Sequence, residues 1–205
     1  MPTLSNKSKK KNTNNLSTFD IVICALIAAL MFIGAQISLP IGPVPFTLQT
    51  FMLFSMMIAF GGRRTSIGVA VYLLLGAIGV PVFANFKGGI DSLLGPTGGF
   101  LIGFLIASLA YIVLDILLTP LRKKLQSKKT KYVYYGILVL LCDIVMYVFG
   151  LGWFIKVYSA ANGSDGIFMN ALKWCLIPFI VPDLVKIVFA ITVGTTIKPV
   201  VGRKN

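Results

Sequence analysis

Six long apolar segments dominate this sequence and restrict the folds that it can adopt. They cover residues 19–39, 46–60, 65–80, 98–118, 132–154 and 176–197. A helix needs about 20 apolar residues to cross a bilayer, and in lipid it satisfies its own backbone hydrogen bonds. The second and third segments are short, so we expect them to tilt little or to continue into the irregular stretches beside them. The pattern predicts an all-α membrane protein with a bundle of six transmembrane helices.

The basic residues indicate how such a bundle lies in the membrane. Fifteen of the 19 Lys and Arg residues lie in the N-terminal tail, in the second and fourth connections or at the C-terminus. By the positive-inside rule, both termini are cytoplasmic. The net charge of +13 therefore sets orientation and does not indicate a nucleic-acid partner. We expect residues 1–17 to form a flexible basic cytoplasmic tail near anionic lipid, and residues 18–200 to form one six-helix domain.

The stretch 76–100, GAIGVPVFANFKGGIDSLLGPTGGF, combines glycine and proline with apolar side chains. Glycine and proline make a regular helix unfavourable here, while side chains such as Phe83 require burial. Irregular backbone at membrane depth is tolerated where it lines a cavity. We therefore expect a partly re-entrant loop that forms one wall of a binding cavity, the alternative being an ordinary hairpin between two helices. The loops 40–45, 81–97 and 155–173 then face outward together.

Charged residues within the apolar segments are candidates for function, because a charge at the centre of a spanning helix costs at least about 2.5–3.5 kcal/mol. Asp115 lies near the basic run 122–131, where an interfacial and a functional role are equally open. Asp143 is either a packing hydrogen bonder or a site residue. Asp183 and Lys186 are three positions apart and share one helix face, so they either neutralise each other or form a site.

A site that contains Asp183 and Lys186 would suit a small, amphipathic, anionic organic molecule. Lys186 can bind a carboxylate or a phosphate, and Asp183 can accept hydrogen bonds from N–H groups of a ligand. The amide of Asn85 comes from the glycine-rich loop, which can reach the outward half of the last helix. The aromatic residues available as apolar walls are Phe46, Phe83, Phe86, Tyr147 and Trp153.

Several classes of function are not supported by the sequence. It contains no GxxxxGK[ST] phosphate loop, so we expect ATP to be hydrolysed by other subunits. It has no His and no Glu, and their absence excludes most types of hydrolase active site and of metal site. An intramembrane pair of Asp143 and Asp183 has no flanking motif to support catalysis. The three cysteines fall in apolar segments without metal-ligand spacing, so we expect neither a metal nor a cofactor.

Small residues recur at four-residue spacing on three segments. Gly99 and Gly103 belong to such a row at the start of the fourth segment, and Gly68 lies on one face of the third. Ala25 and Ala29 form a similar face on the first segment. Small residues let helix backbones approach closely. These faces either pack within the bundle or, for Ala25 and Ala29, receive another protein.

Four motifs in this order resemble a known family. They are GPVPFTLQT at 42–50, YLLLGAIGVPVFA at 72–84, GPTGGF at 95–100 and PDLVK at 182–186. The sequence resembles the BioY family, the biotin-binding S components of energy-coupling factor (ECF) vitamin transporters, over residues 19–197. The resemblance implies a prokaryotic cell-membrane protein that holds biotin near the outer face. It also implies a partner module of one transmembrane T component and two ATPases. One departure is Pro182, where glycine often precedes the aspartate in this family.

The resemblance also implies roles for individual residues. It matches Ala25 and Ala29 to the face that docks the T component, and Asp183 and Lys186 to the biotin site. Asn85 lies in the corresponding loop. The remaining residues that we expect at the biotin site are Phe83, Gly88, Gly89 and Tyr147.

Biotin offers a carboxylate, two ureido N–H groups, a ureido carbonyl and an apolar thioether ring. We expect Lys186 to bind the carboxylate, and Asp183 with Asn85 to bind the ureido ring; the reversed pose stays open. The main alternative is a facilitator that moves biotin or another small anion without ATPases. A scaffold or an intramembrane enzyme is a more distant alternative.

Overall fold

The structure is a computed structural model that describes residues 17–40, 42–125, 127–163 and 166–202. Its longer helices are α1 Thr18–Gln36, α2 Gln49–Phe60, α3 Gly62–Ala77, α5 Gly98–Leu117, α7 Lys128–Asn162 and α9 Ile177–Gly202. Its short elements are β1 Ser38–Leu39, β2 Phe46–Thr47, the 3-10 turn η1 Ala84–Phe86, α4 Ile90–Leu94, α6 Thr119–Lys124 and α8 Ile167–Cys175. The fold is therefore almost wholly helical, as expected, with one antiparallel β1–β2 ribbon added.

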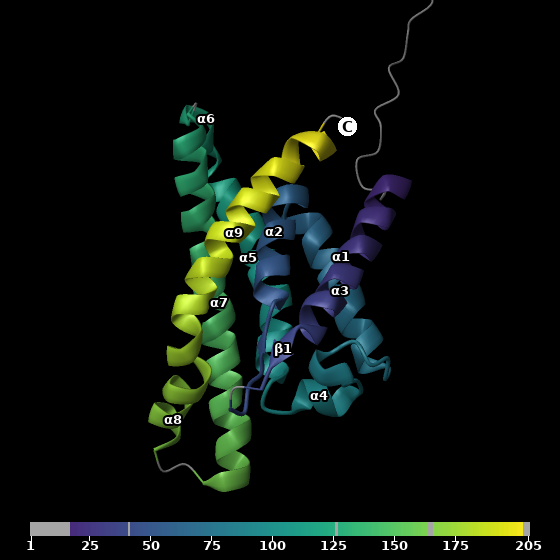
Figure 1. The fold of residues 1–205 in the computed structure, drawn as a ribbon, viewed down its shortest axis with the longest axis vertical. Coiled ribbons are helices and arrows are strands. Elements are labelled where there is room, and N and C mark those ends of the chain that lie inside the picture. The colour runs from purple at the N-terminus through teal and green to yellow at the C-terminus, as the bar shows by residue number, and fades with distance from the viewer. Residues whose placement is uncertain (1–16, 41, 126, 164–165, 203–205) are drawn as a thin grey trace, which may run out of the picture.

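The short elements gather at the two ends of the bundle. Figure 1 shows β1, α4 and α8 at one end, and α6 together with the C-terminal end of α9 at the other. The loops expected to face outward thus lie at a common end. The predicted tail lies outside the described residues except for Ser17, which caps α1 by accepting a hydrogen bond from the Asp20 backbone N–H at 3.2 Å.

Four helical segments are long and apolar enough to cross a membrane. They are α1, α5, α7 and the continuous stretch Ile167–Pro199 that joins α8 to α9. The 12-residue α2 is about 18 Å long, well short of the hydrocarbon core of about 30 Å. The described part of the chain is thus a helical membrane protein with four clear candidate spans, and the count of six spanning helices stays a prediction.

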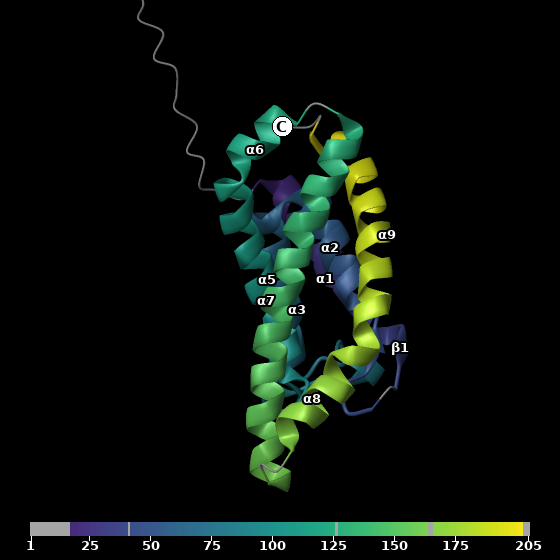
Figure 2. The ribbon, with the colours of Figure 1, turned by 90° about the vertical axis from the view of Figure 1, so that its left-hand side faces the viewer.

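The expected outer loop at 155–173 is mostly helical, which corrects the sequence-based boundary. Helix α7 continues to Asn162, and α8 then runs back along the bundle from Ile167. No glycine or proline interrupts the chain from 155 to 162, whereas Gly163 adopts a left-handed φ of 86° and ends α7. Figure 2 shows α7 extending beyond the other helices at the α8 end.

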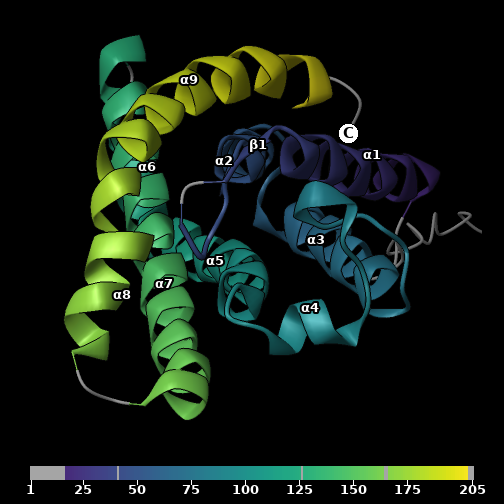
Figure 3. The ribbon, with the colours of Figure 1, turned by 60° about the horizontal axis from the view of Figure 1, so that its bottom comes forward.

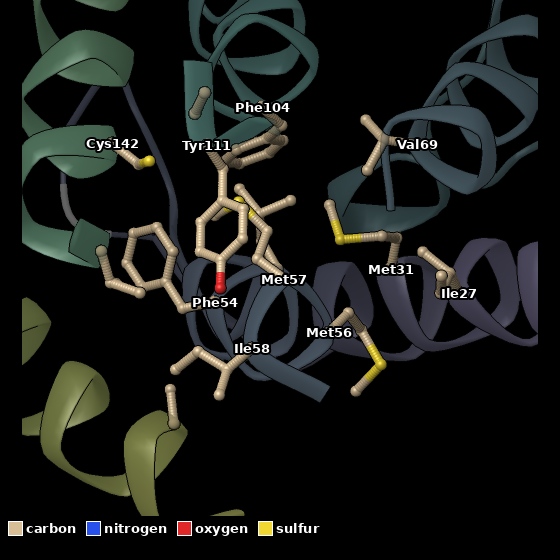
Figure 4. Close-up of a cluster of buried hydrophobic side chains, with 14 of the residues drawn as sticks. Ile27, Met31, Phe54, Met56, Met57, Ile58, Val69, Phe104, Tyr111 and Cys142 are labelled. Atoms are coloured by element: carbon tan, nitrogen blue, oxygen red, sulfur yellow. The ribbon is translucent and has the colours of Figure 1, made fainter. Parts of the chain in front are cut away.

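Helix α2 occupies the centre of the bundle. This position accommodates a helix that is too short to cross the bilayer. Nine of its 12 residues are buried, and it packs against α1, α3, α5 and α9. Figure 4 shows Phe54, Met57 and Ile58 of α2 in a cluster with Phe104 and Tyr111 of α5. Because other helices surround it, the length of α2 is set by the protein rather than by the bilayer.

Small residues bring the surrounding helices close together, as the sequence spacing indicates. A Cβ at Gly68 would lie 2.6 Å from the Ile27 side chain, so α3 packs directly on α1. A Cβ at Gly103 would lie 3.2 Å from Met146, where α5 packs on α7. These small residues therefore have a packing role inside the bundle.

Ala25 and Ala29 behave differently, because both are exposed on the outer face of α1. Their neighbours Cys24 and Ala28 point into the bundle and are buried. The Ala25–Ala29 face is therefore not buried by packing within the described structure.

Two acidic residues at the α6 end form ion pairs with basic residues. Asp115 accepts hydrogen bonds from Arg122 at 2.9 Å and from the Tyr134 hydroxyl at 2.8 Å. Asp20 forms an ion pair with Arg64 at 2.6 Å. Asp115 thus has an interfacial partner in the basic run that follows it, which satisfies its charge without a ligand.

Candidate substrate-binding site

A cavity of about 480 Å³ lies at the end of the bundle that carries β1, α4 and α8 (Figure 1). Figure 3 views the bundle from this end, with α7 and α8 on one side, α1 and α3 on the other, and α5 between them. The loop 40–47, the loop 83–97 and the helices α2, α5, α7 and α9 all contribute lining residues. The glycine-rich stretch therefore forms a cavity wall, as expected, rather than a plain hairpin.

Asp183 and Lys186 form the most polar part of the lining. They face the same side of α9, and the Lys186 Nζ atom lies 2.9 Å from the Asp183 Oδ1 atom. The two residues are only 3% and 7% exposed, so the pair is removed from water. Pro182, the first residue of the motif PDLVK at 182–186, is accommodated inside α9. The structure thus brings together the pair that the sequence singled out.

All three donors of the Lys186 ammonium group are occupied within the protein. Besides Asp183, the Nζ atom donates to the Thr47 carbonyl at 2.8 Å and to the Thr50 hydroxyl at 3.1 Å. It also lies 3.8 Å from the centre of the Phe46 ring, a favourable cation–π arrangement. Lys186 therefore ties α9 to the β1–β2 ribbon, and a ligand must replace a neutral acceptor to reach it.

Asp183 is the second centre of this network. Its Oδ1 atom accepts hydrogen bonds from Lys186 and, at 3.2 Å, from the Thr50 hydroxyl. Its Oδ2 atom accepts a hydrogen bond from the Tyr147 hydroxyl of α7. A carboxylate can accept about four hydrogen bonds, so Asp183 retains capacity for one ligand N–H group. Tyr147, which also lines the cavity, holds this carboxylate in place.

Asn85 and Phe83 reach the cavity from the opposite wall. Asn85 adopts a left-handed conformation with φ 58°, which asparagine tolerates better than most residues. Its Oδ1 atom accepts a hydrogen bond from Ser38 at 2.9 Å, and Gln36 of α1 donates to the Phe83 carbonyl at 3.0 Å. The Phe83 ring packs edge-on against Tyr72. These contacts fix the loop against α1 and α3.

Some predicted site residues lie away from the cavity. Gly88 and Gly89 do not line it; Gly89 donates to the Gly76 carbonyl at 2.7 Å and anchors the loop on α3. Phe86 is 65% exposed on the outside, so its proposed role as an apolar wall is wrong. Trp153 is also absent from the lining and donates to the Gly95 carbonyl at 3.0 Å.

The cavity also contains residues that sequence reasoning missed. Thr47, Gln49 and Thr50 line it, although they belong to the motif GPVPFTLQT that was used only for recognition. Lys87 lines the mouth, is exposed, and supplies a second cation. The signal for Lys87 in the sequence is its place in the glycine-rich loop that is expected to face outward.

Asp143 lies outside the cavity lining. It is 7% exposed, and its Oδ1 atom has no hydrogen-bond partner in the described part of the chain. Among the described residues, this Oδ1 atom therefore has no partner for the role of packing hydrogen bonder.

The geometry describes a cavity with an apolar body, a buried ion pair at its floor and an amide and an amine near its mouth. Comparisons with known proteins identify its family. Residues 7–203 match the sequence profile of the BioY family. The chain belongs to the BioY family.

Curated relatives of this BioY-family chain match it over nearly their full length. The chain is 35% identical to the "Biotin transporter BioY" of Thermotoga maritima over 181 residues, or 87% of this chain and 95% of that protein. It is 35% identical to the "Probable biotin transporter BioY" of Pyrococcus horikoshii, covering 85% and 93% of the two chains. The relatives are named as transporters, in agreement with the expectation that the chain is not an enzyme.

A solved structure has the same fold. It is described as the S-component for biotin from an ECF-type ABC transporter and superposes with a TM-score of 0.73 at 23% identity. The match covers 90% of this chain and 95% of that one. The chain thus shares its overall helical fold with that solved structure.

Proposed function

We propose that the chain is the biotin-binding S component of an ECF-type importer, and that it captures biotin from outside the cell. The observation that carries the proposal is the buried Asp183–Lys186 pair at the floor of a cavity of about 480 Å³. Small-molecule sites typically enclose about 300–1,000 Å³ and combine apolar walls with a few polar groups. Names of relatives that match nearly the whole chain support biotin as the ligand.

In the proposed pose, Lys186 binds the carboxylate of biotin. A carboxylate can replace the Thr47 carbonyl or the Thr50 hydroxyl around the ammonium group, because hydrogen bonds between charged groups are about twice as strong as neutral ones. The free capacity of Asp183 and the amide of Asn85 then bind the ureido ring. Phe83 and Tyr147 supply walls, whereas Gly88 and Gly89 act by shaping the loop.

The reversed pose places the carboxylate at the mouth, where Lys87 offers an exposed cation. The variants Lys186→Met and Lys87→Met separate the two poses, because each removes a charge and keeps an apolar side chain. Their affinities for biotin and for biotin amide should be measured with the purified chain. Tight binding of biotin by the unmodified chain, tested against a panel of other vitamins, is the first requirement.

We expect Lys186→Met to weaken biotin binding by about 30- to 4,000-fold, the effect of truncating one partner of a buried charge pair. The amide already lacks the carboxylate and should lose much less, while Lys87→Met should have a small effect on both ligands. If Lys87→Met shows the large and carboxylate-specific loss instead, the reversed pose is correct. If no vitamin binds the unmodified chain, the proposed function is wrong.

We further propose that α1 docks a T component through Ala25 and Ala29, and that two ATPases complete the importer. The exposure of both alanines supports a contact with another protein. A stand-alone facilitator remains the second candidate, because an exposed small-residue face does not itself require a partner. Both candidates place the chain in the cell membrane with its termini in the cytoplasm, on the basis of the charge asymmetry.

A further inference from the structure

Asp143 is a buried carboxylate that the proposed biotin site does not use. It lies near the middle of α7, is 7% exposed, and its Oδ1 atom accepts no hydrogen bond within the described residues. Ionisable residues in membrane spans without a partner are candidates for function. Asp143 lines neither the substrate cavity nor the cavity beside Asp20 and Asp115, and the smallest ligand that its carboxylate can take is a proton.

The position of Asp143 connects it to the floor of the biotin cavity. Tyr147 lies one helical turn away on the same face of α7 and donates a hydrogen bond to Asp183 of α9. Helices α7 and α9 pack against each other and run in opposite directions (Figure 2). Asp143 therefore lies about one turn beneath the cavity floor, and Cys142 is its other titratable neighbour on α7.

The charges that act on Asp143 come from α9, which contributes Asp183 and Lys186. Among the other helices packed against α7, the charged residues are Asp115, at the far end of α5, and Lys173 of α8. Their other titratable residues, Tyr111 of α5 and Cys175 of α8, are ordinarily neutral. One ammonium group thus faces two buried carboxylates. Its three donors are already directed at Asp183, Thr47 and Thr50, and none is directed at Asp143.

An anionic ligand adds a third negative charge to this group. Repulsion between buried charges is weakly screened, so occupancy of the cavity favours neutralisation of one carboxylate. Asp143 is the better acceptor of a proton, because three donors stabilise Asp183 as an anion and none of the described residues donates to Asp143. A metal ion would require several oxygen ligands, and the described residues contain no suitable cluster.

We propose that Asp143 is a proton-binding site coupled to biotin binding: it binds one proton from the solvent when the carboxylate of biotin occupies the cavity. The complex therefore contains biotin and one additional proton, and no covalent bond changes. This inference rests on the proposed function, because it requires an anionic ligand next to Lys186.

The test is isothermal titration calorimetry of the purified chain with biotin, in buffers of different ionisation enthalpy, from about pH 6 to about pH 9. The dependence of the heat on the buffer gives the number of protons bound per biotin. We expect uptake of about one proton at the upper end of this range, and a dissociation constant that rises there by about tenfold per pH unit. Asp143→Asn, which is neutral and of equal size, should bind biotin without proton uptake and with little pH dependence.

The same titration with biotin amide provides a control that needs no variant. The amide is neutral, so the unmodified chain should bind it without taking up a proton. If biotin binds without proton uptake, if the amide causes equal uptake, or if Asp143→Asn retains it, the inference is wrong. These outcomes differ from a failure of the proposed function, in which biotin does not bind at all.

Discussion

The ion pair between Lys186 and Asp183 leads to a quantitative prediction about stability. Asp183 is 3% exposed, and in Lys186→Met its carboxylate keeps only the neutral donors Thr50 and Tyr147. Removing one partner of a buried ion pair destabilises proteins by about 3–5 kcal/mol. For a chain of about this length, 1 kcal/mol corresponds to roughly 2–4 °C in Tm. We therefore expect the Tm without ligand to fall by roughly 6–20 °C.

The assay follows from the buried cysteines. Cys24, Cys142 and Cys175 are free and buried, so a thiol-reactive fluorescent dye reports unfolding of the purified chain in detergent. Lys198→Met is a matched control, because among the described residues the Lys198 Nζ atom donates only to the Tyr135 hydroxyl, at 2.7 Å. We expect the control to change the Tm little.

A second variant separates loss of the charge pair from loss of packing. Lys186→Met combined with Asp183→Asn removes the isolated charge and keeps an oxygen that can accept from Thr50 and Tyr147. The double variant should recover more than half of the lost Tm. The reasoning is refuted if Lys186→Met unfolds at the temperature of the control, or if the double variant is as unstable as the single one.

Two further predictions concern orientation and docking. Lys128 and Lys156 are both exposed on α7 and lie about 42 Å apart along its axis; a cysteine at 156 should react with an impermeant reagent outside intact cells, and a cysteine at 128 should not. The opposite labelling would reverse the topology. Ala25→Leu with Ala29→Leu should preserve biotin binding and abolish energised uptake, because larger side chains prevent close helix approach. Loss of binding, or normal uptake, would contradict docking at this face.

The sequence by itself determined the class of the protein and the identity of its most important polar pair. Apolar segments of this length require helices in lipid, and the three-residue spacing of Asp183 and Lys186 places them on one face of any helix. The glycine-rich stretch was recognisable as a cavity wall, because irregular apolar backbone at this depth needs protein cover. These inferences depend on local geometry, which the sequence of each segment determines by itself.

Only the tertiary structure decided which residues meet across the bundle. The ammonium group of Lys186 meets Thr47 and Thr50, which precede it by more than 130 positions, and no local pattern encodes that contact. Phe86 is exposed and Lys87 reaches the mouth because the Gln36 side chain of α1 accepts a hydrogen bond from the Phe86 backbone N–H and orients the loop. Asp143 was ambiguous as a sequence feature, because only packing shows whether a buried oxygen has a partner. Burial and pairing depend on all the surrounding helices, so they follow from the assembled fold and not from any one segment.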